Sequence, residues 1–167
     1  MAVREILKFG NPGLARKSEA VAVIDDEILA LIRDMVETMH NAPGIGLSAP
    51  QVNANRRVIT VDLSLGEDPG GLHILINPVI LRAEGRCVRE EGCLSVPEIF
   101  EKVARPQKIT VQGLDPEGGE RTFEAEDLLA RAFCHEIDHL EGKLFVEYLS
   151  PLKRSLIKKK FKKPAKP

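Results

Sequence analysis

The sequence predicts an α+β fold, in which mixed or antiparallel sheets pack around a central helix and a further helix follows at the C-terminus. Three observations support this prediction. Apolar residues near the start recur at helical spacing, several short runs in the middle are rich in β-branched residues, and two more helical segments follow those runs. The chain therefore lacks the regular alternation of strands and helices that predicts a parallel sheet.

The segment DDEILALIRDMVETMH, residues 25–40, predicts the first helix. Its apolar side chains at helical spacing are Ile28, Ile32, Met35, Val36 and Met39. Asp25 or Asp26 is placed to cap the N-terminus. Pro43 and Gly44 follow in the sequence NAPG, and neither residue continues a helix.

Strands and two further helices follow the first helix. Runs of β-branched residues between Gly, Pro and Asp predict strands at 57–63, 73–81, 108–115 and 121–126. A second helix is expected from about Asp127 to Glu141, because Gly142 is a natural C-terminal stop. Ser150 and Pro151 predict the start of a third helix, since serine caps and proline is tolerated at the first helical position.

Composition predicts one folded domain with a basic extension. The 167 residues are 43% hydrophobic and 29% charged, an ordinary balance for a globular protein. Residues 153–167 hold eight of the 24 basic residues and no acidic residue, which leaves 16 basic and 25 acidic residues in 1–152. We expect a single domain over 1–152 and a basic C-terminal helix or tail over 153–167 that meets an anionic partner.

Two further features concern the cellular compartment. No apolar run approaches the roughly 20 residues of a membrane span, so residues 1–10 are expected to be neither an anchor nor a signal peptide. The three cysteines are an odd number, which argues against a disulfide framework and indicates a reducing compartment.

The sequence FCHEIDHLEG, residues 133–142, predicts a metal site on the second helix. His135 and His139 are four residues apart and share one helix face, so their imidazoles can reach one metal ion. Glu136 follows the first histidine as in the H-E-x-x-H pattern of metallohydrolases, where it is the general base. A solvated polar face with incidental histidines is the alternative, and a mostly apolar helix argues against it. We therefore predict a metal-binding helix and, over 1–152, a catalytic domain.

The third ligand is best supplied by Cys93. Downstream of the second histidine, Glu141 and Glu147 are candidates, but no histidine remains. Cys93 lies in EEGCLSVP, where glycine and proline predict a turn beside a strand end, and its thiolate can approach a metal there. Cys134 points about 100° away from the histidine face, and Cys87 falls in an expected strand, so both are interpreted as packing residues. Three protein ligands leave an open fourth position, which is typical of a catalytic site.

At this point the sequence closely resembles the peptide deformylases. That family is defined by three short motifs, which match GIGLSAPQ at 44–51, EGCLSVP at 91–97 and HEIDH at 135–139. The resemblance extends over nearly the whole chain and implies a metal-dependent hydrolase that removes the N-formyl group from the formyl-methionine of newly made polypeptides and releases formate. It also implies Fe²⁺ as the metal, with Zn²⁺, Ni²⁺ or Co²⁺ able to occupy the site.

The resemblance implies a role for each motif residue. A metal-activated water attacks the formyl carbon, and Glu136 acts as general acid and base. The side chain of Gln51 and the backbone N–H of Leu94 match the donors that stabilise the oxyanion. Gly46 gives room for a peptide that adds as an extra strand. The residues that match the family's substrate pocket are Gly46, Ile45, Glu91, Leu128, Arg131 and Ala132.

Two positions depart from the common family pattern. Ser48 stands where alanine is common, and Cys134 stands where glutamine is common before the first histidine of HEIDH. Both positions lie outside the set of ligands and acid–base residues, so the expected reaction class is unchanged.

Three other functions remain open at this point. A metal-dependent endopeptidase or other amidase would use the same ligands, a cysteine hydrolase would use Cys93 as nucleophile, and a non-catalytic relative would only bind ribosomes or peptides. We expect cytoplasmic N-formyl-methionyl nascent peptides as substrates, no membrane association, and a ribosome contact through the basic tail at 153–167.

Overall fold

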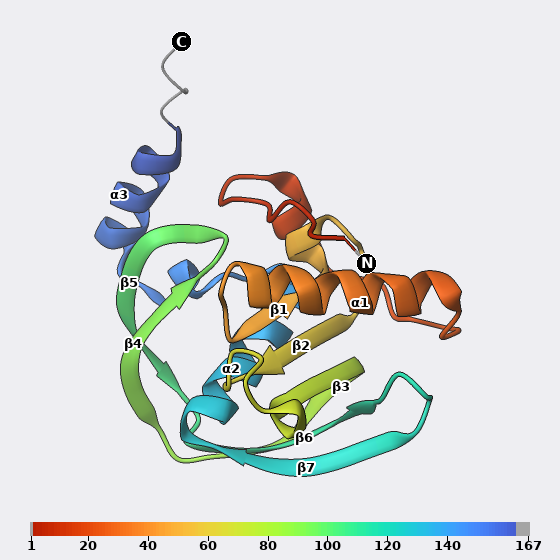
Figure 1. Cartoon of the computed structure of the whole chain (residues 1–167). Coiled ribbons are helices and arrows are strands. Elements are labelled where there is room, and N and C mark those ends of the chain that lie inside the picture. The colour runs from red at the N-terminus through yellow and green to blue at the C-terminus, as the bar shows by residue number, and fades with distance from the viewer. Residues whose placement is uncertain (1, 163–167) are drawn as a thin grey trace.

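The structure is a computed structural model that describes residues 2–162, and it contains two antiparallel sheets (Figure 1). The α-helices are α1 (Asp26–Asn41), α2 (Asp127–Leu140) and α3 (Pro151–Lys162). The strands are β1 (Gly46–Ser48), β2 (Val58–Asp62), β3 (Leu72–Glu84), β4 (Cys87–Cys93), β5 (Val96–Arg105), β6 (Lys108–Leu114) and β7 (Glu120–Glu126). The larger sheet has the order β1-β2-β3-β6-β7, and β4 and β5 form a separate hairpin. Short 3₁₀ helices span Pro12–Leu14, Ala49–Val52, Pro69–Gly71 and Phe145–Tyr148.

Helix α1 covers one face of the larger sheet. The Asp25 carboxylate accepts a hydrogen bond from the backbone N–H of Ile28 at 3.0 Å, which caps the helix as the sequence predicts. The buried side chains of α1 are Ile28, Leu31, Ile32, Met35, Thr38 and Met39. They pack with Val58 of β2, so the apolar stripe of the helix is matched to an apolar strand.

Helix α2 covers the opposite face and contacts strands of both sheets (Figure 1). Strand β2 is buried on both sides: Val58 packs toward α1, whereas Ile59 and Val61 pack with Phe133 of α2. Because successive side chains of a strand point to opposite faces, β2 contributes apolar side chains to the core on both faces of the sheet. The position of α2 between the sheets makes it the central helix that the sequence predicts.

The end of α2 requires a glycine. Gly142 has a φ of +76°, and a Cβ at this position would lie 2.5 Å from the backbone oxygen of Ala15. A side chain is therefore excluded both by backbone conformation and by space. The N-terminal segment is held against this end of α2 by a hydrogen bond from the backbone N–H of Ser18 to the backbone oxygen of Leu140, at 2.8 Å.

A third apolar cluster joins the β4–β5 hairpin to the C-terminal helix. Ile157 of α3 is buried in it with Val103 of β5 and Phe145, while the ring of Phe161 lies 5.6 Å from that of Phe9. Ser150 Oγ accepts a hydrogen bond from the backbone N–H of Lys153, which caps α3. Among residues 2–162, no helix combines the length and the apolar character needed to cross a membrane.

The predicted α+β architecture is confirmed, and its sheets are of the antiparallel kind. All three predicted helices and all four predicted strands are present, with ends shifted by at most a few residues. Strands β1 and β5 were not predicted, whereas a strand was expected around Cys87, where β4 begins. Residues 163–167 of the predicted basic tail lie outside the described residues.

Candidate metal centre

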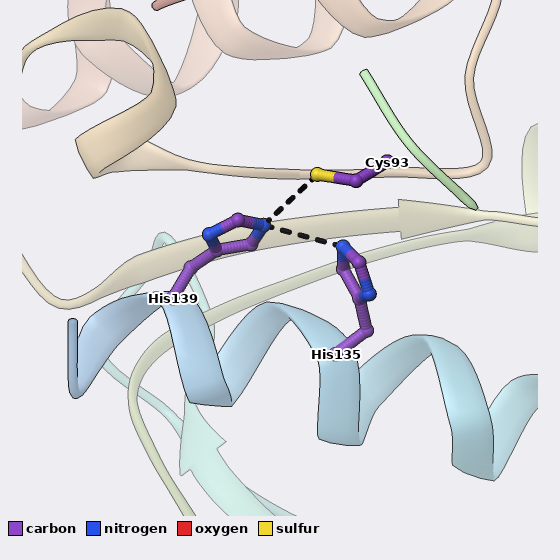
Figure 2. Close-up of side chains that lie close together, drawn as sticks. All are labelled: Cys93, His135 and His139. Atoms are coloured by element: carbon purple, nitrogen blue, oxygen red, sulfur yellow. Dashed lines mark hydrogen bonds between the residues drawn. The ribbon is translucent and has the colours of Figure 1, made fainter. Parts of the chain in front are cut away.

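Three side chains from the two separate motifs converge on one point. The Nε2 atoms of His135 and His139 lie 3.2 Å apart, and Sγ of Cys93 lies 3.4 Å from Nε2 of His139 (Figure 2). Donors at about 2.0–2.3 Å from a common tetrahedral metal ion would be about 3.3–3.6 Å apart. The three ligand atoms all lie within 4.8 Å of one another, so the residues fit a single metal ion.

Two elements hold these ligands. His135 and His139 project from the same face of α2, whereas Cys93 is the last residue of β4 and pairs with Val96 across the hairpin turn. The pairing of β4 with β5 is irregular between Glu91 and Cys93. Such a bulge re-aims a side chain, which here is directed toward the helix.

The charges around the cluster favour a positive charge at its centre. Burial and the neighbouring His135 hold the pKa of His139 well below its ordinary value. Burial alone would lower the pKa of His135, but the charges of Cys93 and Glu136 outweigh it and raise that pKa well above normal. The cluster therefore retains a proton that a bound metal ion would displace, since metal ligands bind in their deprotonated forms.

Glu91 fixes the orientation of His135. Nδ1 of His135 lies 2.7 Å from Oε2 of Glu91, so a proton on Nδ1 leaves Nε2 free to face Cys93. Burial would raise the pKa of Glu91, but hydrogen bonds from His135 and Arg105 outweigh it and lower the pKa to about 2. Glu91 is therefore a carboxylate acceptor at every physiological pH.

A buried charge network surrounds this carboxylate. Arg105 donates to both oxygens of Glu91, at 3.1 and 2.7 Å, and to Oδ2 of Asp138 at 2.6 Å. Arg131 donates to Oε1 of Glu91 at 2.9 Å. Tyr148 donates its hydroxyl to the same oxygen of Asp138 at 2.7 Å, and its ring lies under the Arg105 guanidinium. Two cations and two anions balance, as buried charges require.

Glu136 faces the site as an acid. Burial raises its pKa to about 7, and among the described residues no hydrogen-bond partner reaches its Oε2 atom. A general acid–base residue works best with a pKa near the operating pH, so this carboxyl group is suited to move a proton at neutral pH.

A cavity of about 520 Å³ opens in front of these groups. Of the predicted site residues, all but the fully buried His139 line it: Ile45, Gly46, Gln51, Glu91, Cys93, Leu94, Leu128, Arg131, Ala132, His135 and Glu136. Exposed apolar side chains of Leu65 and Phe100 lie at the same cavity. Such exposed apolar residues are typical of a binding groove.

Ser48, one of the two departures from the common family pattern, holds the side chain of Gln51. Ser48 donates both its backbone N–H and its hydroxyl to Oε1 of Gln51, each at 3.0 Å. The amide nitrogen of Gln51 therefore points the other way, toward Ser95 Oγ at 3.1 Å and Cys93 Sγ at 3.7 Å. The donor end of this side chain lies at the metal site.

The other residues considered as metal ligands have ordinary structural surroundings. Glu141 pairs with Arg57 and Lys17 at the end of α2, away from the ligand cluster, and Glu147 is exposed. Cys134 is buried in the core of α2, where burial raises its pKa to about 11. Arg105 could not be singled out from the sequence, because no motif places it near residue 91 or residue 138.

Comparison with known proteins gives a consistent result. The family model described as polypeptide deformylase matches residues 3–155. The peptide deformylase of Nitrosococcus oceani is 50% identical over 98% of this chain and 96% of its own length. A peptide deformylase structure from Legionella pneumophila matches with a TM-score of 0.90 and 37% identity, over 98% of this chain and 100% of that one. One from Ehrlichia chaffeensis in complex with actinonin gives 0.90 and 38%, over 97% of both chains.

Proposed function

Because the chain belongs to the polypeptide deformylase family, we propose that it removes the N-formyl group from the N-terminal formyl-methionine of newly made polypeptides and releases formate. The family's enzymes remove formyl groups from N-terminal methionine. The observation that carries the proposal for this chain is a set of three clustered ligand side chains, with the buried carboxyl group of Glu136 beside them at a cavity.

We propose that Cys93, His135 and His139 hold one metal ion, and that the ion is Fe²⁺. The donor set of one thiolate and two imidazoles suits several divalent metals, so Zn²⁺, Ni²⁺ or Co²⁺ would also bind. When bound, such an ion supplies a Lewis acid that lowers the pKa of water to near 7.

Glu136 would take a proton from the attacking water and deliver it to the leaving amine. Its buried carboxyl group, with a pKa of about 7, is half ionised at neutral pH and serves in both directions. Glu91 would keep its charge throughout and hold His135 in one tautomer.

Gln51 and Leu94 would stabilise the oxyanion that develops on the formyl oxygen. The amide nitrogen of Gln51 points toward Cys93, and Leu94 is the next residue along the chain and lines the cavity. Donors fixed in place before the reaction stabilise developing charge without reorganising, which is the physical basis of an oxyanion hole.

The peptide would lie along strand β1. This strand is at the edge of the larger sheet, so one side of its backbone is not paired within that sheet. Gly46 and Ile45 line the cavity there, and an extended peptide can add to such an edge. The methionine side chain would be received by Leu128, Ala132 and the ring of His135, with Glu91 and Arg131 behind them.

The proposed setting is the cytoplasm, at or near the ribosome. Helix α3 carries exposed lysines on one side while Ile157 is buried on the other. A basic surface of this kind suits the phosphates of ribosomal RNA, and residues 153–167 continue the basic composition.

The decisive experiment measures formate release from formyl-Met-Ala-Ser by anaerobically purified protein, with the metal content determined on the same sample. Glu136→Ala should abolish release while it retains its metal, whereas Glu147→Ala, an exposed control, should behave like the parent protein. Parent activity should follow metal occupancy. A fully metallated protein that releases no formate would refute the proposal, and new internal peptide ends would indicate an endopeptidase.

A further inference from the structure

Both terminal nitrogens of the Arg131 guanidinium group are hydrogen-bonded to protein atoms. Nη1 donates to Oε1 of Glu91 and to the backbone oxygen of Val103, both at 2.9 Å, and Nη2 donates to the backbone oxygen of Cys87 at 2.8 Å. The side chain is only 6% exposed. Although Arg131 lines the cavity, its charged end is committed to protein atoms.

Helix α2 therefore binds the Glu91 carboxylate twice. Arg131 bonds Oε1, and His135, four residues later on the same face, bonds Oε2. Two contacts from one rigid helix, one to each oxygen, fix the plane of the carboxylate relative to the helix axis. That plane in turn sets the rotation of the His135 ring.

Arg131 also ties this helix to the hairpin that carries the third ligand. Cys87 is the first residue of β4 and Cys93 is the last, while Val103 lies in β5. The guanidinium thus bonds both strands of the hairpin and also Glu91, two residues before Cys93. These contacts limit how far the hairpin can shift relative to α2.

We propose that Arg131 is a positioning residue for the metal site: it holds Glu91 and the β4–β5 hairpin so that Nε2 of His135 faces Sγ of Cys93. Arg105 is not a substitute, because it reaches Glu91 from β5 and its side chain donates, among residues 2–162, to the carboxylates of Glu91 and Asp138 and not to the backbone of β4. The inference rests on the proposed metal site but not on the identity of the substrate.

The test compares Arg131→Met with Arg121→Met, which removes the same charge from an exposed side chain on β7. Each protein is loaded with Co²⁺, and both its visible absorption spectrum and the rate of Co²⁺ loss to a chelator are recorded. Loss of a residue that orients a metal ligand typically weakens metal binding about 10–100-fold. We expect Co²⁺ loss from Arg131→Met to accelerate by about that factor with a changed spectrum, and the Arg121 variant to match the parent.

A double-mutant cycle separates positioning through Glu91 from general support of the fold. If Arg131 acts through Glu91, then Arg131→Met should accelerate Co²⁺ loss much less in a Glu91→Gln background than in the parent. Equal acceleration in both backgrounds would overturn positioning through Glu91. Arg131→Lys, which keeps the charge and one donor, should fall between Met and the parent and also decides the matter if Arg131→Met does not fold.

Substrate binding is the competing role for Arg131, and it gives a different result. A parent-like spectrum and rate of Co²⁺ loss, together with a raised KM, would overturn the positioning role. Formate release by the parent protein is measured in parallel. A parent that binds Co²⁺ but releases no formate would refute the proposed reaction and leave the Arg131 comparison valid.

Discussion

The Glu136 carboxyl group lies against the backbone of Gly46, so that a Cβ added to residue 46 would be 3.0 Å from both Cδ and Oε2 of the glutamate. This distance is shorter than ordinary van der Waals contact. The glycine of the first motif therefore makes room for the proposed acid–base residue of the third.

Substitution of this glycine should reduce turnover without unfolding the protein. Gly46→Ala would displace the Glu136 carboxyl group by a few tenths of an ångström, and misplacement of a catalytic group by about 1 Å can cost about 100-fold. We expect kcat to fall by about tenfold or more. Gly70→Ala, where a Cβ would meet only Asp68 at 3.4 Å, is the matched control for formate release and thermal stability. Unchanged kcat in Gly46→Ala would contradict the expectation.

The hydrogen bonds from Ser48 to Gln51 predict graded effects on activity. Ser48→Ala removes the hydroxyl donor but keeps the backbone N–H, so the Gln51 amide stays oriented and kcat should fall only a few-fold. Gln51→Ala removes the proposed oxyanion donor and should reduce kcat by about 10²–10³. Steady-state kinetics with formyl-Met-Ala-Ser checks both values, and a larger loss in Ser48→Ala than in Gln51→Ala would contradict this order.

The raised pKa of Glu136 should make the metal-free protein less stable at high pH. The folded-state pKa of about 7 exceeds the ordinary 4.5, so folding is favoured by the protonated carboxyl group below pH 4.5, and this contribution disappears as the pH rises through 7. At pH 8 the loss is on the order of 3 kcal/mol.

Glu136→Gln cannot lose a proton, so its metal-free form should unfold at higher urea concentration than the parent at pH 8. The two proteins should converge near pH 5. Glu147→Gln, an exposed control, should follow the parent at both pH values. If Glu136→Gln gains no stability between pH 5 and pH 8 relative to the parent, the raised pKa is wrong.

Charge reversal on α3 should weaken ribosome binding and leave peptide hydrolysis intact. Lys158, Lys159 and Lys162 are exposed, so their replacement by Glu spares the buried Ile157 that fixes the helix. Sedimentation with ribosomes at low salt should show affinity lower by about tenfold or more, because binding through phosphate contacts depends on the number of cations.

A control variant isolates the position of those charges. Arg16, Arg33 and Arg86 are exposed on other parts of the molecule, and their replacement by Glu changes the net charge by the same amount. This protein should bind ribosomes nearly as well as the parent. Equal weakening in both variants would point to overall charge and would exclude a docking role for α3.

The parts of the structure that could be predicted from the sequence depend on local signals. Helix α2 is specified by its own residues, since His135 and His139 are brought together by helix geometry alone. Gly142 and the Asp25 cap likewise act within a few residues of their positions. These signals were sufficient for the helix bounds and for two of the three ligands.

A strand was expected around Cys87, but the β4–β5 hairpin was not predicted, because β5 and the exposed part of β4 lack the usual pattern of a strand. Strand β5 contains Pro97 and several charged residues, and much of β4 is exposed to solvent on both faces. Its stability depends on pairing and on contacts with α2 that no local window contains. The charge network has the same property, because Glu91 meets Arg105 and Arg131 across 14 and 40 residues of sequence.

The separation of the proposed ligands in sequence has a consequence for when the site can form during synthesis of the chain. Cys93 and His139 are 46 residues apart, so a growing chain has no complete set of proposed ligands until the segment that carries His139 has been synthesised. Under the proposed function, a molecule can therefore act on a formyl-methionyl peptide only after both motifs have been made and packed together.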